Sequence, residues 1–138
     1  MPHVVIVEDD AMNARFMDTV LRRRGGFNVT VTEDVETLLR LAREGSADLV
    51  LMDVSLKNSV YRGRAVDGLQ ITRLLKEDPA TASVPVILAT AHAMRGDRER
   101  LLAESKADEY VSKPIVDQLA LIETIKKWIA KKGAVESR

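Results

Sequence analysis

The sequence predicts an α/β fold, a doubly wound parallel sheet of five strands flanked by five helices. Short runs of Val, Ile and Leu, as in 4–7 and 49–52, are typical of strands buried on both faces of a parallel sheet. A segment with apolar residues at helical spacing follows each predicted strand, and such repeats with right-handed crossovers build one sheet covered by helices. The 138 residues suffice for one domain with a buried core.

The predicted strands and helices alternate along the chain. In order they are the strand 4–7, the helix from Asp10 to Gly25-Gly26, the strand 27–31, the helix from Asp34 to Gly45, the strand 49–52, the helix 67–76, the strand 84–90, the helix 96–104, the strand 110–112 and the helix 118–130. The strands 4–7 and 49–52 are wholly apolar and are expected at the centre of the sheet. The strand 27–31 alternates apolar and polar residues, as a strand near an edge does.

Capping residues support the predicted helices. Asp10 and Asp34 are residue types favoured at the N-cap, where the carboxylate accepts hydrogen bonds from free backbone N–H groups. Glycines end these two helices, at Gly25-Gly26 and at Gly45. Pro79 marks the exit from the third helix.

The last predicted helix has one apolar face and sets the end of the domain. This face consists of Leu119, Ile122, Ile125 and Ile129. Packing against the sheet is the preferred interpretation, and a part in a dimer contact is the alternative. We place one domain at 1–131, followed by a short tail at 132–138.

Charge and composition exclude several classes of function. The 21 Lys and Arg residues balance 21 Asp and Glu residues, so no net field attracts nucleic acid or an anionic membrane. The absence of cysteine excludes disulfides, thiol catalysis and cysteine-based metal sites, and it fits a reducing cytoplasm. No signal segment is present, and no apolar run approaches the ~20 residues of a membrane helix. We expect a soluble, cytoplasmic protein without a nucleic-acid or membrane partner.

Three acidic residues follow two of the apolar strands. Glu8 and Asp9 come directly after 4–7, and Asp53 follows 49–52. Because ligands of such sheets bind beyond the carboxyl ends of the strands, we expect the three carboxylates to lie together. They repel one another unless a hard cation lies between them, and Mg²⁺ is the usual partner. A helix cap or the start of a solvated loop is the alternative interpretation of each acid.

Five features in this order resemble the receiver domain of bacterial two-component response regulators. They are Glu8-Asp9 after the first strand, Asp53 after the third, Asp67-Gly68 opening the third helix, Thr90-Ala91 ending the fourth strand and Lys113-Pro114 after the fifth. The match covers about residues 3–131 and implies the flavodoxin-like fold of CheY-like proteins. The C-terminal half, from Ala91 to Ile115, also resembles single-domain regulators of the DivK type and the receivers of hybrid kinases.

The resemblance implies that Asp53 takes a phosphoryl group from a phosphohistidine and becomes an acyl phosphate, in a reaction that needs Mg²⁺, with Mn²⁺ as the alternative. The implied metal ligands are Glu8, through a metal-bound water, Asp9, Asp53 and the backbone carbonyl of Ser55. Lys113 and Thr90 would each bind a phosphoryl oxygen. A cis Lys113–Pro114 bond would aim the lysine into the site. An ordinary structural role is the alternative for Thr90 and Lys113.

The resemblance also implies a switch. Thr90 would move toward the phosphoryl group, and Tyr110 would turn into the space beside Ala91, so that the surface of the fourth helix, fifth strand and last helix changes shape. A fixed aromatic residue of the strand is the alternative for Tyr110. His92 either tunes hydrolysis of the acyl phosphate or is a surface side chain.

The loop 57–66 departs from the family pattern. It is roughly seven residues longer than usual, a length that a surface loop accommodates at little cost in closure entropy. Lys57 occupies the position where the family usually has proline. We hypothesise that Tyr61, Arg62 and Arg64 shape partner choice or that an arginine screens the phosphoryl group. A functionally silent loop is the alternative.

The sequence thus predicts a stand-alone response regulator of a two-component or phosphorelay system that signals by altered protein contacts. It is not expected to be an enzyme, apart from assisting its own phosphorylation and dephosphorylation. Its expected partners are a sensor histidine kinase or histidine phosphotransfer protein and a downstream protein target, with the chain itself a monomer or weak dimer. An intermediate phosphorelay shuttle is an alternative. A Mg²⁺-dependent phosphate-handling α/β enzyme is less favoured, because Ser55 replaces the general-acid aspartate that aspartyl-phosphate hydrolases need.

Overall fold

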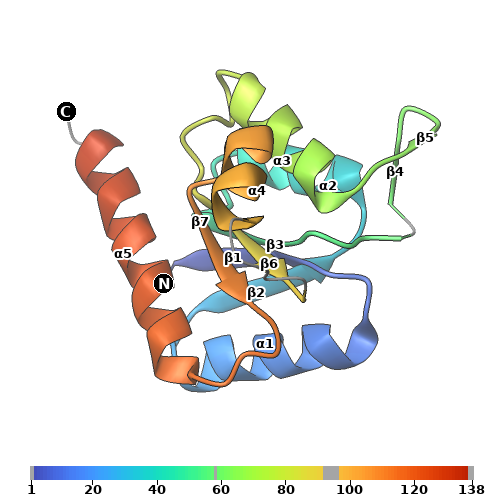
Figure 1. The fold of residues 1–138 in the computed structure, drawn as a ribbon. Coiled ribbons are helices and arrows are strands. Elements are labelled where there is room, and N and C mark those ends of the chain that lie inside the picture. Colours follow the sequence, from blue (N-terminus) through green and yellow to red (C-terminus); the bar gives the residue numbers. More distant parts are fainter. Residues whose placement is uncertain (1, 58, 92–96, 137–138) are drawn as a thin grey trace.

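The computed structural model describes residues 2–57, 59–91 and 97–136, which form a layered α/β fold (Figure 1). Within these residues, five parallel strands make one sheet of order β2-β1-β3-β6-β7. The strands are β1 (His3–Val7), β2 (Asn28–Thr32), β3 (Leu49–Asp53), β6 (Val86–Thr90) and β7 (Glu109–Ser112). The predicted sheet is confirmed, with the two wholly apolar strands inside it and β2 at an edge.

Helices cover both faces of the sheet. They are α1 (Ala11–Arg23), α2 (Val35–Arg43), α3 (Gly68–Glu77), α4 (Asp97–Ser105) and α5 (Gln118–Glu136). The helices α1 and α5 lie on one face, and α2, α3 and α4 lie on the other (Figure 1). This is the doubly wound arrangement that strand–helix alternation predicts.

Alternating residues of each strand supply the two halves of the core. In β1, Val5 and Val7 belong to the cluster that includes α2, α3 and α4, whereas Val4 and Ile6 belong to the cluster with α1 and α5. All four side chains are at most 1% exposed. Each such burial contributes about 1.5–3 kcal/mol, and burial on both faces explains why the strand is apolar throughout.

The predicted capping residues begin their helices. Asp10 accepts hydrogen bonds from the N–H groups of Met12 and Asn13 at 2.9 and 3.1 Å. Asp34 accepts one from the N–H of Thr37 at 3.1 Å. Asp10 is the N-cap of α1 and follows Glu8 and Asp9 directly. The helix α1 therefore begins right after the acidic residues at the carboxyl end of β1.

The inserted segment 57–66 contains a short hairpin that the sequence did not predict. Its strands β4 (Val60–Tyr61) and β5 (Arg64–Ala65) are antiparallel. The two residues between them, Arg62 and Gly63, have φ angles of 53° and 79°, the left-handed conformation of a type I′ turn. The hairpin stands out from the body beyond the end of β3 (Figure 1).

The helix α5 runs beyond its predicted end at Ala130 and takes in most of the predicted tail. The lysines that follow are good helix formers, and a glycine such as Gly133 costs only about 1 kcal/mol within a helix. No helix in the described part of the chain has both the length and the apolar character needed to cross a bilayer.

The predicted apolar face of α5 is partly wrong. Ile122 and Ile125 are buried and support the core interpretation, and Ile129 is half-buried. Leu119, however, is 60% exposed. Since a helix turns by 100° per residue, Leu121 and not Leu119 completes the buried face beside Ile122 and Ile125.

Candidate functional site

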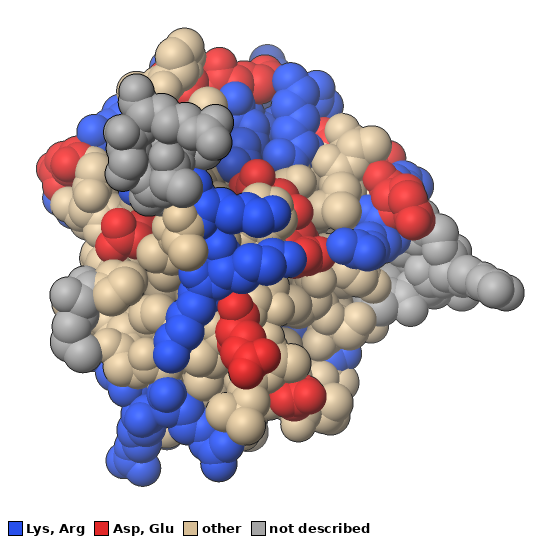
Figure 2. All heavy atoms as spheres, turned by 90° about the vertical axis from the view of Figure 1, so that its left-hand side faces the viewer, with Lys and Arg blue, Asp and Glu red and all other residues tan. Residues whose placement is uncertain are grey.

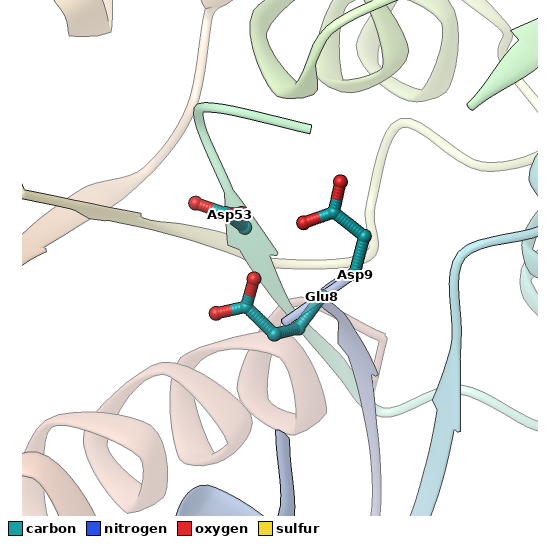
Figure 3. A group of neighbouring side chains, drawn as sticks. All are labelled: Glu8, Asp9 and Asp53. Carbon is teal, nitrogen blue, oxygen red and sulfur yellow. The ribbon is translucent and has the colours of Figure 1, made fainter. Parts of the chain in front are cut away.

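The ends of β1 and β3 bring the three predicted acids together. The two strands pair in parallel register with Val7 opposite Met52, so the next residues of both strands emerge at the same edge of the sheet. Glu8, Asp9 and Asp53 each offer a carboxylate oxygen, and these oxygens lie within 4.8 Å of one another (Figure 3). Glu8 and Asp53 are each only 4% exposed, whereas Asp9 is half-buried.

Lys113 bridges the two buried carboxylates. Its Nζ donates hydrogen bonds to Glu8 Oε1 at 3.1 Å and to Asp53 Oδ1 at 2.9 Å. The Lys113 N–H also donates to the carbonyl of Thr90 at 2.8 Å, and the Lys113–Pro114 peptide bond is cis. The lysine therefore reaches the site from the end of β7 and adds one positive charge between two negative ones.

The protonation of these groups follows from their burial and contacts. Burial and the neighbouring Asp53 raise the pKa of Glu8 to about 7. Burial alone would raise the pKa of Asp53, but hydrogen bonds from Glu8 and Lys113 outweigh it and hold this pKa below its ordinary value. Burial disfavours the charged form of Lys113, yet the two carboxylates raise its pKa. Asp53 is thus an anion and Lys113 a cation near neutral pH.

Backbone N–H groups also donate hydrogen bonds to two of the carboxylates. The N–H of Ser55 donates to Asp53 Oδ1 at 3.2 Å, and the N–H of Lys57 donates to Asp9 Oδ2 at 2.7 Å. Sequence reasoning missed the second contact, because a backbone bond to an acid 48 positions away leaves no pattern in the sequence. These groups surround an open cavity of about 330 Å³ lined by Glu8, Asp9, Asp10, Asn13, Asp53, Ser55, Lys57 and Lys113.

The Asp67-Gly68 pair supports the same site from α3. Asp67 caps the helix and forms a reciprocal capping box with Gln70. The Gly68 N–H donates to the carbonyl of Val54 at 3.2 Å. A Cβ atom at Gly68 would overlap the carbonyl oxygen of Asp53, so only glycine lets the helix approach the chain this closely.

The predicted switch residues lie on neighbouring strands. Thr90 ends β6, is 1% exposed and stands opposite Ser112 of β7. Tyr110 of β7 is half-buried and packs against the core cluster of α2, α3 and α4. His92 lies outside the described residues.

The donor set fits a small divalent cation. Three carboxylates at one edge of the sheet offer the hard oxygen ligands that Mg²⁺ takes, and their open cavity leaves room for water ligands. The Lys113 ammonium compensates part of the same negative charge. The chemistry of the site is therefore that of an anionic pocket for a hard cation with an adjoining positive charge.

Comparisons with known proteins show to which family the chain belongs. A family model described as the response regulator receiver domain matches residues 4–126. The chain is 37% identical over 126 residues to the polar-differentiation response regulators DivK of Brucella ovis and Brucella anthropi, covering 91% of this chain and 94% of each relative.

Solved structures share the fold of this chain. The receiver domain of the sensor histidine kinase PA1611 from Pseudomonas aeruginosa PAO1, which has a magnesium ion in its active-site cleft, is 29% identical with a TM-score of 0.76, covering 94% of this chain and 98% of that one. A CheY-like receiver domain from Methanospirillum hungatei JF-1 shares the fold, with a TM-score of 0.77 at 19% identity, over 97% of this chain and 98% of that one.

Proposed function

Because this chain belongs to the response regulator receiver domain family, we propose that Asp53 is its phospho-acceptor and that Glu8, Asp9 and Asp53 hold Mg²⁺ during the transfer. The observation that carries this proposal is the buried Asp53 carboxylate, kept ionised beside Glu8 and bonded to Lys113 at 2.9 Å. An ionised carboxylate is the form that can attack phosphorus.

The transfer is an in-line displacement. An oxygen of Asp53 attacks the phosphorus of a phosphohistidine, the P–N bond breaks, and the imidazole leaves with the electron pair and takes up a proton. Lys113 then exchanges its bond to the carboxylate for one to a phosphoryl oxygen, and the Thr90 hydroxyl bonds another. Mg²⁺ held by Glu8, Asp9 and Asp53 would neutralise part of the negative charge of the reacting groups. The Ser55 carbonyl is our candidate for a further metal ligand.

Loss of the phosphoryl group uses the same residues. Water attacks the phosphorus of the acyl phosphate and loses a proton, the bond between phosphorus and the Asp53 oxygen breaks, and inorganic phosphate leaves while Asp53 returns to a carboxylate. Lys113 stabilises the negative charge that develops on the phosphoryl oxygens. The chain thus assists its own dephosphorylation without acting on other substrates. Closure of Thr90 onto the phosphoryl group, followed by Tyr110, carries the change to the surface of α4, β7 and α5.

The donor is a protein, either a sensor histidine kinase or a histidine phosphotransfer protein. The apolar surface beside the acidic cavity supports this: Met12 is 83% exposed, and Phe16 lines a second cavity of about 220 Å³ together with Ile115. The two cavities share Lys113 in their linings. Exposed apolar side chains next to a polar site are typical of a surface that another protein covers.

Intact-mass measurement tests this function. The wild type and Asp53→Asn are incubated with acetyl phosphate and Mg²⁺, and each is measured promptly in the cold. We expect one phosphoryl adduct on the wild type, none on the variant and none when EDTA removes the metal. An adduct of equal yield on Asp53→Asn would show that another residue is the acceptor.

A further inference from the structure

Lys57, the first residue of the inserted segment, lines the cavity that holds the three carboxylates. Its backbone N–H donates to Asp9 Oδ2 at 2.7 Å, and its side chain is exposed. The proline that the family resemblance leads us to expect at this position has neither the N–H nor the charge. Lys57 therefore brings both a backbone donor and a positively charged side chain to this position.

The backbone around Lys57 is fixed on both sides. Leu56 is 7% exposed and belongs to the core. Ser59 is 3% exposed, its hydroxyl donates to the carbonyl of Glu33 at 2.8 Å, and its carbonyl accepts the N–H of Val66 at 3.0 Å. These contacts hold the segment that carries Lys57 beside the cavity that this residue lines.

The two lysines of the cavity differ in what they already contact. Lys113 bridges Glu8 and Asp53, so the carboxylates engage its ammonium before a donor arrives. Lys57 forms no ion pair with any residue of the described ranges. A donor phosphoryl group with up to about two negative charges must enter a pocket rich in acids, and a cation at the entrance offsets that repulsion.

We propose that Lys57 is a phosphodonor-binding residue, whose ammonium holds an oxygen of the donor's phosphoryl group at the cavity entrance while Asp53 attacks phosphorus. The ligand is a phosphoryl group bonded to a good leaving group, such as an acyl oxygen or an imidazole nitrogen. Lys57 transfers no proton and forms no covalent bond; the bond that forms is to Asp53, and the bond that breaks is to the leaving group. The inference rests on the proposed function, because it adds a contact to the same transfer.

The arginines of the hairpin do not take this role. The Arg62 guanidinium lies over the ring of Tyr61, 5.1 Å from its centroid, in the turn of the hairpin. Neither Arg62 nor Arg64 lines the acidic cavity. Of the cations in the described part of the insertion, the structure assigns Lys57 to the phosphoryl group in place of either arginine.

The test measures phosphorylation rates with two small donors, acetyl phosphate and phosphoramidate, at saturating Mg²⁺. We expect Lys57→Ala to lower the apparent second-order rate constant about three- to tenfold with both donors, the size of one charge contact near water. Lys57→Arg should keep most of the rate. The difference between wild type and Lys57→Ala should shrink in high salt, because exposed charges are screened. The affinity for Mg²⁺ should stay unchanged, because the N–H bond to Asp9 remains.

Matched variants and donors separate the outcomes. Lys126→Ala removes the same charge from an exposed position of α5 and should leave the rate unchanged. Equal rates for wild type and Lys57→Ala would overturn the role of Lys57 while leaving Asp53 as acceptor. A loss confined to acetyl phosphate would also overturn it and place the contact on the acetyl group. No adduct on the wild type with either donor would overturn the proposed function and this inference together.

Discussion

At the scale of single residues, one ammonium group allows two carboxylates to be buried side by side. Lys113 bonds both Glu8 and Asp53, and the three groups lie almost out of contact with solvent. Burying such charges costs several kcal/mol per ion, which their mutual attraction repays only in part. The part of this cost that is not repaid favours the protonated form of Glu8, whose pKa is raised to about 7.

The raised pKa of Glu8 predicts a pH dependence of stability in the metal-free protein. The folded value of about 7 lies above the ordinary 4.5, so folding takes up a proton between these values. The stabilising contribution is complete below pH 4.5 and is lost as the pH rises through 7. Urea unfolding in EDTA should therefore show that the wild type loses stability relative to Glu8→Gln between pH 5 and 8. A constant difference between the two proteins would contradict this.

Gly68 gives a second prediction at the residue scale. Gly68→Ala places a methyl group against the Asp53 carbonyl, so α3 or the end of β3 must shift. We expect a loss of about 1–3 kcal/mol in the free energy of unfolding and slower phosphorylation by acetyl phosphate. Gln70→Ala, which weakens the cap of the same helix without an overlap, should lower stability less and leave the rate near wild type.

The sequence predicted which acids meet, because residues after parallel neighbouring strands must emerge at one edge. It also singled out Asp67-Gly68, but only by resemblance; the close approach that demands glycine is visible only in three dimensions. The bond between Lys57 and Asp9 could not be predicted, since it depends on the path of an inserted segment with no pattern of its own.

At the scale of elements, the sheet and its helices follow the predicted order, with bounds that differ by one or two residues for most strands. The hairpin of β4 and β5 was missed because two-residue strands are too short for an apolar alternation, and its turn is Arg62-Gly63 instead of the usual Asn-Gly or Asp-Gly. The end of α5 was predicted at Ala130, whereas the helix continues to Glu136. Patterns within a short stretch of sequence fail to predict a strand or a helix end where tertiary packing or the length of the element decides whether it forms.

The base of the hairpin offers a test at this scale. Ser59→Ala removes the buried hydroxyl that donates to the Glu33 carbonyl at 2.8 Å, leaving that carbonyl without this partner. We expect a loss of about 1–2 kcal/mol in the free energy of unfolding, measured in urea. Ser83→Ala, at an exposed position, should change stability little. Equal losses in the two variants would show that the hydroxyl does not anchor the insertion.

At the scale of the whole molecule, the site collects residues from both halves of the chain. The acids come from β1 and β3, whereas Lys113 follows β7, the last strand of the sheet. A ligand that binds them together must therefore stabilise the complete sheet and not one segment of it.

Binding of Mg²⁺ should therefore raise the stability of the whole protein. At about one hundred times its dissociation constant, Mg²⁺ should add about 2.7 kcal/mol to the free energy of unfolding of the wild type. Asp9→Asn should lose most of the gain, and Glu99→Gln, which removes a charge from an exposed position of α4, should keep it. Thermal unfolding of each variant with Mg²⁺ and with EDTA measures the gain in stability that the metal gives. An equal gain in the two variants would contradict the metal site.

The hydrogen bond between Lys113 and Glu8 joins residues 105 positions apart. During synthesis, the first strand leaves the ribosome long before the lysine that completes its site. A nascent or truncated chain that lacks the end of the sheet holds unneutralised acids and no complete cavity for a phosphoryl group. Under the proposed function, phosphate acceptance therefore requires the sheet to be complete through β7, so that a chain without Lys113 does not compete for the donor.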